Sequence, residues 1–318
     1  MTLSDTTADA LRAMTEGCAV VDRSERGKLA LTGAEAKEFL HGQVTNDVER
    51  LQPGEGCYAA FLTHKGKMLG DLRILDAGDE LLLDTERVAL QELFNMIRRF
   101  KLGRHVELHK RTLESGLLSL IGPDARRAAG AGELPETEHA HRTATVGGAR
   151  VRLVATDLGV DVLCNAADKE AVAAALIAEG AAPATEAAAE VRRVETGRPR
   201  YGADLDDTVI PQEAGLNARA VSFEKGCYVG QETVARLHFR GKPNRNLRGL
   251  RLSGPAERGT PLRLGEREVG RLGTVVESPS HGWIALALVR REATPGDVLD
   301  AGPGGVRAEV VDLPFAQA

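Results

Sequence analysis

The chain has 318 residues, of which 42 % are hydrophobic, 27 % charged and 3 % aromatic, and its formal net charge is −5. This length predicts two or three domains, and a composition near the globular average excludes wholesale disorder. The negative net charge argues against a protein whose main work is to bind long nucleic acid through a basic surface. The chain has no run of about 18 apolar residues, which a membrane span would need. Residues 1–10 lack a basic segment followed by an apolar one, so we expect a cytoplasmic protein.

The first part of the chain alternates short apolar strands with helices. Residues 18–22 and 28–32 are predicted strands, and a capping box formed by Thr32 and Glu35 predicts a helix that ends near Gly42. Three more strands follow at residues 57–63, 67–75 and 80–84. Residues 87–102 carry apolar side chains at helical spacing, which predicts a surface helix with one buried face.

The pattern of elements changes near Pro243. Before it, residues 143–166 alternate around Gly147 and Gly148 as a hairpin does, and residues 169–179 are a predicted helix. After it, short strands separated by glycine and proline turns predict a small all-β barrel. We therefore expect an α+β fold in which ferredoxin-like, split βαβ units occupy residues 1–240, as two intertwined subdomains, and the barrel occupies residues 241–318.

The four cysteines show no metal-ligand or disulfide spacing, but Cys227 lies in a distinctive motif, "EKGCYVGQE". Lys225 places a cation two residues away, and Gly230 is a plausible break before a short helix whose positive end would face the thiol. Both features would favour a reactive thiolate. The alternative is a buried structural cysteine, which is a common role for this residue type.

The surrounding residues resemble a known family. The ordered residues Glu195, Gly197, Tyr201, Gly202, Asp204, Pro211 and Glu213 resemble the folate-binding part of the glycine-cleavage T-protein, or aminomethyltransferase. Residues 225–232 and the following "VAR" and "RGKPNR" look like the signature of the YgfZ family, a T-protein offshoot implicated in iron–sulfur cluster maintenance and tRNA modification. Residues 39–75 are similar to the N-terminal segment that both share.

This resemblance implies tetrahydrofolate or a folate derivative as cofactor. It places Glu195 against the pterin ring, because one carboxylate can accept hydrogen bonds from both the amino group and the ring N–H. Tyr201 would supply a wall of the pocket, Gln231 would contact the ligand, and Arg236, Arg192 or Arg198 would meet the carboxylates of the folate tail. Without the resemblance, Glu195 is an exposed helix residue that pairs with Arg192 or Arg198.

The chain departs from the T-protein where that family transfers an aminomethyl group. Only Asp71 remains of an expected aspartate pair, because Gly70 replaces its neighbour, and residues 84–86 replace an expected asparagine-alanine step. The resemblance to YgfZ implies that Cys227 is the chemical centre, with Lys225 beside it. One cysteine cannot hold a stable cluster, so we expect transient handling of a cluster together with iron–sulfur proteins or assembly factors.

Three interpretations of function stay open. The leading one is a folate-binding accessory protein for iron–sulfur enzymes, the second a true aminomethyltransferase acting through Asp71, and the third a folate-sensing module without chemistry. Whether the protein is an enzyme is left open. A basic run after the motif could bind polyglutamyl folate, an acidic partner or tRNA, although a solvated linker is the simpler interpretation. We expect residues 204–207 to be a solvated acidic turn and predict no metal site.

Overall fold

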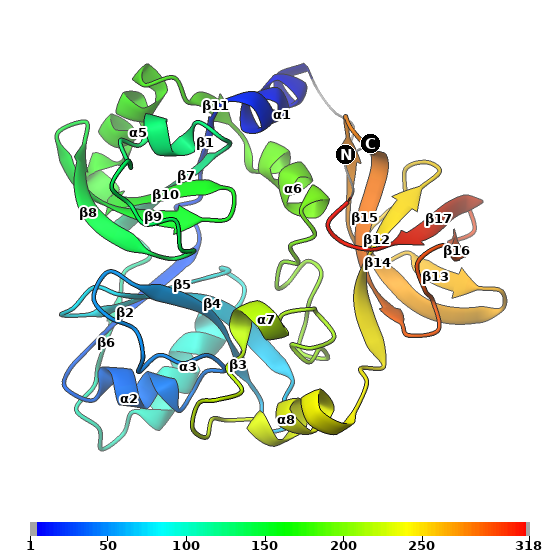
Figure 1. The fold of residues 1–318 in the computed structure, drawn as a ribbon, viewed down its shortest axis with the longest axis horizontal. Coiled ribbons are helices and arrows are strands. Elements are labelled where there is room, and N and C mark those ends of the chain that lie inside the picture. The colour runs from blue at the N-terminus through cyan, green and yellow to red at the C-terminus, as the bar shows by residue number, and fades with distance from the viewer. Residues whose placement is uncertain (1–4, 316–318) are drawn as a thin grey trace.

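A computed structural model describes residues 5–315, which form two β-sheets with their helices and a separate barrel (Figure 1). The expected α+β class and the C-terminal all-β barrel are both confirmed. Within the described residues, no helix is long and apolar enough to cross a membrane.

The first sheet has six strands in the order β11-β1-β7-β10-β9-β8, antiparallel except for the β11–β1 pair. Its apolar face packs against α5, through Val172 and Leu176, and against α4. The strands are β1 (Ala19–Asp22), β7 (Ser115–Ile121), β8 (His141–Val146), β9 (Ala149–Thr156), β10 (Gly159–Asn165) and β11 (Ala182–Ala184), and the helices are α4 (Ala125–Ala128) and α5 (Lys169–Ala178), which a 3-10 turn (Ala166–Asp168) precedes.

The second sheet has five antiparallel strands in the order β3-β4-β5-β2-β6. Leu93 and Ile97 of α3 and Phe39 and Leu40 of α2 fill its core, as helical spacing of apolar residues requires. The strands are β2 (Gly27–Thr32), β3 (Gly56–Leu62), β4 (Met68–Asp76), β5 (Leu81–Thr85) and β6 (Glu107–Lys110), and the helices are α2 (Ala36–His41) and α3 (Leu90–Phe100).

Six strands close the C-terminal barrel in the order β12-β15-β14-β13-β16-β17. Residues 241–244 join it to α8 (Gln231–Arg240), which lies near the predicted domain boundary. The strands are β12 (Arg245–Leu252), β13 (Pro261–Leu264), β14 (Arg267–Ser278), β15 (Gly282–Arg290), β16 (Val298–Ala301) and β17 (Val306–Val311).

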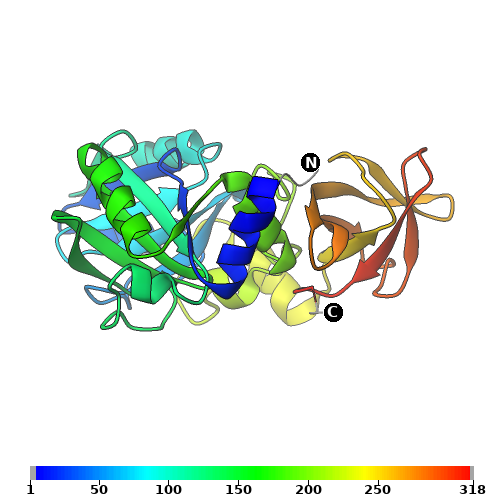
Figure 2. The same ribbon diagram turned by 90° about the horizontal axis from the view of Figure 1, so that it is seen from above.

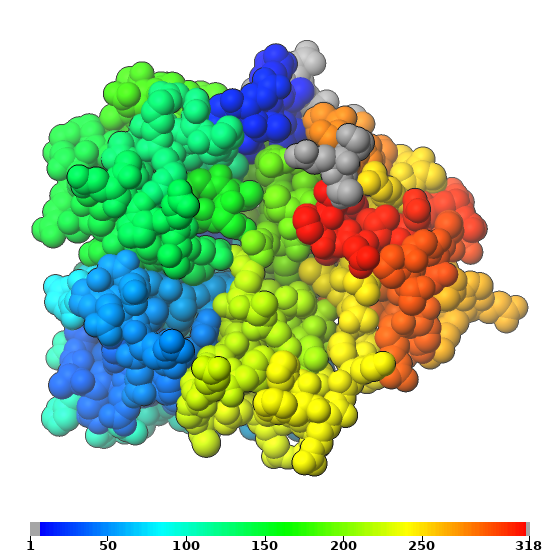
Figure 3. Space-filling model, viewed as in Figure 1, coloured from blue at the N-terminus to red at the C-terminus, as the bar shows by residue number. Residues whose placement is uncertain are grey.

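Helices α1 (Asp5–Glu16) and α6 (Glu186–Glu195) lie between the sheets and the barrel (Figure 2). Met14 of α1 and Val194 of α6 share one buried cluster with Ile284 and Leu286 of β15, so apolar burial attaches the barrel to the rest of the chain. The segment after α6, which includes α7 (Asn217–Ala220), occupies the space between the second sheet and the barrel (Figure 3).

The predicted capping box at the start of α2 is absent, although the helix itself is present. Helix α2 begins at Ala36, close to the predicted start, but no capping box forms. The Glu35 carboxylate accepts a hydrogen bond from the His105 backbone N–H at 2.5 Å, and the Thr32 hydroxyl contacts the ring of His109 at 2.8 Å. Bonds to residues distant in sequence therefore replaced the local cap.

Candidate functional site

A cavity of about 200 Å³ lies where the two sheets meet the segment that follows α6. Its walls are mainly charged side chains, a costly arrangement unless the charges are paired. From the second sheet and its edges come Arg26, Tyr58, Asp71, Arg73, Asp84 and Glu86; from the first, Ser119 and Asp161; and from the connecting segments His139, Arg198, Arg200, Tyr201 and Arg219.

Ion pairs cross between the two sheets on one side of this cavity. Arg26 donates to the Asp84 carboxylate at 2.7 Å, and Arg73 contacts both Asp84 on β5 and, at 2.6 Å, Asp161 on β10. Burial alone would raise the pKa of Asp84, but the two guanidinium groups outweigh it and lower this pKa to about 2. Asp84 is therefore a fixed anion that holds Arg73 in place, and Arg73 joins the sheets through Asp161.

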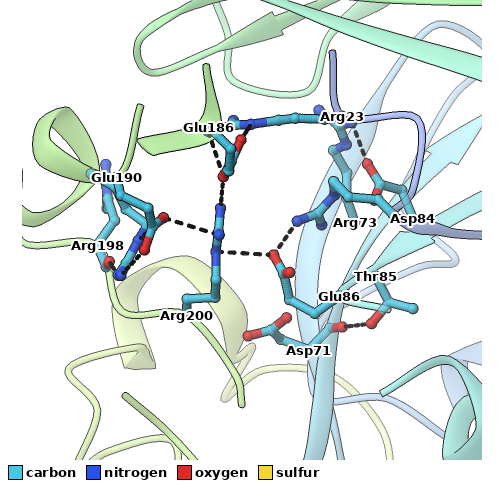
Figure 4. A network of polar contacts seen from close by, with 12 residues as sticks. Arg23, Asp71, Arg73, Asp84, Thr85, Glu86, Glu186, Glu190, Arg198 and Arg200 are labelled. Atoms are coloured by element: carbon cyan, nitrogen blue, oxygen red, sulfur yellow. Dashed lines mark hydrogen bonds and ion pairs between the residues drawn. The ribbon is translucent and has the colours of Figure 1, made fainter. Parts of the chain in front are cut away.

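Arg200 joins the second sheet to α6 on another side of the cavity. Its guanidinium pairs with Glu186 and, at 3.0 Å, with Glu190, both on α6, and lies 3.6 Å from Glu86 after β5 (Figure 4). Arg23 reaches Glu186 from the first sheet at 2.8 Å. The charged walls are thus one connected set of pairs rather than separate salt bridges.

Asp71 is the buried carboxyl of the cavity that forms no ion pair with a guanidinium group among the described residues. It lies on β4, 5 % exposed, and the Tyr58 hydroxyl donates a hydrogen bond to it. Burial raises the pKa of Asp71 to about 6; the bond from Tyr58 opposes this shift, and the Glu86 carboxylate adds to it. Asp71 is therefore poised to exchange a proton near neutral pH.

The structure brings Asp71 and Tyr201 to this cavity but places Glu195 elsewhere. Glu195 is buried at the end of α6, where it accepts a hydrogen bond from the Ser278 hydroxyl of β14 at 2.7 Å and pairs with Arg192. It is not among the residues that line the cavity. Its observed contacts join α6 to the barrel.

The cysteine motif forms a loop against the turn between β3 and β4. Gly230, at φ 85°, immediately precedes α8, and a side chain there would lie 2.5 Å from the Thr63 carbonyl oxygen, so only glycine fits. The predicted break before a short helix is therefore present. Cys227 is exposed in this loop and is not among the cavity-lining residues.

Lys225 fixes the motif loop from inside. It is buried, and its ammonium group donates to the carbonyl oxygens of His41 and, at 2.8 Å, Val44. It also lies 4.9 Å from the ring centroid of the buried Tyr228. Lys225 therefore directs its charge toward the backbone around α2 and anchors the motif loop there.

The polar residues at the end of the motif and after it lie outside the cavity, and several are already paired. Gln231 opens α8, and neither it nor Arg236 lines the cavity. Arg236 pairs with Glu232 on the same helix, while Arg245 pairs with Glu213 at 2.9 Å and Arg248 with Asp312 at 3.0 Å. The basic run is thus partly neutralised by nearby acids, as expected of a linker face.

The prediction of a solvated acidic turn at residues 204–207 was wrong for Asp204. Its side chain is fully buried and accepts hydrogen bonds from Arg193 and the Thr274 backbone N–H, each at 2.7 Å. Because Arg193 on α6 also donates to the Thr274 hydroxyl at 2.7 Å, this cluster connects α6 to β14 of the barrel. Across residues 5–315, no group of three or more histidine, cysteine or acidic side chains is arranged to hold a metal.

Sequence reasoning missed most of the cavity walls. Tyr58, Arg73 and Arg200 lie inside the segments that resemble the family, but no residue that was assigned a role there was one of them, and His139 lay in a segment without periodic pattern. The one available signal was the replacement of the asparagine-alanine step by residues 84–86, since two of these, Asp84 and Glu86, are acids of the ion-pair set.

Comparison with known proteins identifies the fold and the family of this chain. The fold is that of the T-protein: an aminomethyltransferase of the glycine cleavage system from Bartonella henselae superposes with a TM-score of 0.85, at 21 % identity, over 98 % of this chain and 89 % of its own. Residues 1–225 match the GCVT N-terminal domain family, and the chain belongs to it.

Two curated relatives match the sequence of this chain over most of their length. A chloroplastic protein of Arabidopsis thaliana is 30 % identical over 96 % of this chain and 74 % of its own. An aminomethyltransferase of Rubrobacter xylanophilus is 30 % identical over 92 % and 82 %.

We predict that one cysteine of the folded protein reacts readily with iodoacetamide at pH 8. Burial raises the pKa of Cys18 to about 11 and that of Cys57 to about 12, and it also raises the pKa of Cys164, whereas Cys227 is exposed. Peptide mass spectrometry should find the label on Cys227, and Cys227→Ser should remove it. Equal labelling of Cys57, or an unlabelled Cys227, would show that exposure has been misassigned.

We also predict an unusual pH dependence of stability at Asp71. Because its pKa rises from 3.8 to about 6 on folding, ionising it costs stability progressively as the pH rises from about 4 to 6. Asp71→Asn should therefore gain stability relative to wild type between pH 4 and pH 7, by on the order of 3 kcal/mol. Urea unfolding at several pH values measures this gain. Asp79→Asn, in the exposed loop after the same strand, is the control, and an equal gain there would refute the assignment.

Proposed function

We propose that the protein binds a tetrahydrofolate in the central cavity and uses Cys227, outside the cavity, to support assembly or repair of iron–sulfur clusters. The target enzymes would include those that modify tRNA. The observation that carries this proposal is the contrast between an exposed cysteine on a fixed loop and a cavity whose walls are committed to ion pairs.

Folate binding is supported by the family and by the chemistry of the cavity. Asp71 and Tyr201 line it, and so does Arg198, which the resemblance assigns to the folate tail. A volume of about 200 Å³ is below the roughly 300–1,000 Å³ of most ligand pockets, so a pterin ring would enter while the tail stays outside. Glu195 does not line the cavity, and its contacts with Ser278 and Arg192 hold α6 against the barrel, so the proposal assigns the pterin ring to the residues that line the cavity.

The surface thiol suits a transient exchange with another protein. Lys225 and Tyr228 are buried on either side of Cys227 and leave it accessible. A single cysteine supplies one of the roughly four ligands of a stable cluster, so an iron–sulfur protein or assembly factor would supply the others. We do not extend the proposal to direct contact with tRNA, since Arg236, Arg245 and Arg248 pair with acids.

A second candidate function is aminomethyl transfer. Relatives that cover most of the chain are named aminomethyltransferases, and Asp71 lies in the cavity with a pKa near 6. Against this candidate, the acids at positions 84 and 86 pair with Arg26 and so occupy the wall where the T-protein pattern has uncharged residues. In a reconstituted glycine-cleavage assay, formation of methylenetetrahydrofolate that is lost in Asp71→Asn would favour this candidate.

The proposal predicts that Cys227→Ser lowers iron–sulfur enzyme activities in cells under oxidative stress, measured in cells that have this variant as their only copy. Because the thiol lies outside the cavity, calorimetry should show unchanged tetrahydrofolate affinity in the same variant. Cys164→Ser, at a buried cysteine of the first sheet, is the control for loss of a thiol elsewhere. Unchanged enzyme activities, with the variant folded and expressed, would remove the thiol from the function.

A further inference from the structure

A second cavity, of about 500 Å³, lies between the two sheets, and we call it the intersheet cleft. Asp84 is the one residue that lines both this cleft and the central cavity. Strands β9 and β10 of the first sheet form much of one wall, and β5 with the turn before it forms much of the other. The volume falls within the roughly 300–1,000 Å³ of most ligand pockets, so a small molecule has room to bind there.

Arg152, on β9, is a half-buried cation of the cleft without an acidic hydrogen-bond partner. Its Nη1 donates to the Nδ1 of His141 at 2.8 Å, and its other side-chain nitrogens form no hydrogen bond with the described residues. Those nitrogens are not among the buried unpaired atoms, so they are accessible to a ligand. Burial lowers the pKa of Arg152 and the charge of Arg150 adds to this shift, although Glu80 and Asp79 oppose it.

This lowered pKa distinguishes Arg152 from the other described arginines whose pKa is shifted, because each of those is shifted upward. In each of those cases, acidic side chains supply the opposite charge. A partly buried charge is costly unless it is paired, so the surroundings of Arg152 lack an anion that a ligand could supply.

His141 holds Arg152 in place without neutralising it. The imidazole is buried, and burial together with the charge of Arg152 lowers its pKa to about 4, so the ring is neutral at physiological pH. Its Nε2 lies 3.1 Å from the carbonyl oxygen of Glu55, to which it donates, and Nδ1 is therefore the acceptor for Arg152. The guanidinium group is thus oriented, and its positive charge stays available.

Most other charged side chains of the cleft already have partners. Arg111 pairs with Glu80 at 3.3 Å and with Glu114 at 3.0 Å, and Asp84 is held by the arginines described above. The ammonium group of Lys28 donates to two backbone carbonyls. Among the described residues of the cleft, the charged groups that form no ion pair and donate to no carbonyl are Arg150, Arg152 and Asp79. Two guanidinium groups therefore stand against one carboxylate.

Apolar side chains lie beside the two arginines. Arg150 precedes Arg152 by two residues on β9, so both side chains are on one face of the first sheet. Leu163 on β10 is the register partner of Arg152 and lies on the same face. Leu82, half-buried on β5, lines the opposite wall. The cleft thus combines two cationic groups with apolar surface.

We propose that the intersheet cleft is a second ligand site, in which Arg152 and Arg150 bind the carboxylate or phosphate of a small organic anion. The planar donor fork of arginine matches two oxygens of such a group at once, and the anion offsets the repulsion between the two cations. The apolar part of the ligand lies against Leu82 and Leu163. This site goes beyond the proposed function and does not depend on folate binding in the central cavity.

Calorimetry on the full chain at constant ionic strength tests the site, with pentanoate and butyl phosphate as probes. At least one probe should bind wild type with a Kd of about 1 mM or tighter, whereas pentanol, which lacks the charge, should bind far more weakly. In Arg152→Gln the affinity should fall about tenfold or more, the loss of a charge-assisted hydrogen bond. In Arg150→Gln, at an exposed arginine, it should fall by a smaller factor.

Thermal unfolding separates loss of the ligand from damage to the fold. Without probe, Arg152→Gln should melt at the wild-type temperature or higher, because glutamine removes an unbalanced charge and keeps an N–H donor for His141. With probe, the melting temperature of wild type should rise and that of the variant should rise less, since a ligand of the folded state stabilises it. Arg198→Gln is the matched control, because it removes the same charge from the central cavity, and its affinity for the probe should equal that of wild type.

Each outcome decides for or against the site. It is refuted if neither probe binds wild type, if pentanol binds as tightly as the anions, or if Arg152→Gln binds within about twofold of wild type. An equal loss in Arg198→Gln would place the probe in the central cavity, and a lower melting temperature of Arg152→Gln without probe would make Arg152 a structural cation. Binding that requires Arg152 and not Arg198 supports the site, and the tighter probe shows whether it prefers a carboxylate or a phosphate.

Discussion

Paired burial of charge around the central cavity is the constraint on which the arrangement of this protein depends. Arg73 joins the two sheets through Asp84 and Asp161, Arg200 joins the second sheet to α6, and Arg193 joins α6 to the barrel through Asp204. A buried charge that loses its partner is strongly destabilising, so each of these contacts fixes one docking geometry. Apolar packing supplies the attraction between the parts, and the ion pairs specify how the parts meet.

This constraint explains why two acidic side chains of the cavity walls differ in pKa. Asp84 is fixed as an anion by two guanidinium groups, whereas Asp71, only a few residues away across the sheet, keeps a pKa near 6 because burial dominates its environment. The exposed thiol of Cys227 lies outside the cavity, on a separate loop that Lys225 anchors. The fold therefore separates the charged central cavity from the exposed thiol.

The sequence was sufficient for elements that depend on local pattern, and insufficient for contacts between distant residues. Apolar alternation predicted the strands and the barrel, and the glycine of the motif predicted where α8 begins. By contrast, Asp204 was expected in a solvated turn because its partner Arg193 and the Thr274 backbone lie in α6 and the barrel. Lys225 was expected beside the thiol, although its partners His41 and Val44 lie more than 180 residues earlier. Motifs identified candidate residues, but only the packing shows what each one contacts.

The most direct test of this account is a crystal structure of the protein grown with tetrahydrofolate. The account predicts electron density for the pterin ring in the central cavity, against Asp71 and Tyr201. The loop that carries Cys227 should be unchanged, with the thiol free of contact with the ligand. Density for the ring beside Cys227, or anywhere outside the cavity that Arg73 and Arg200 enclose, would contradict the account.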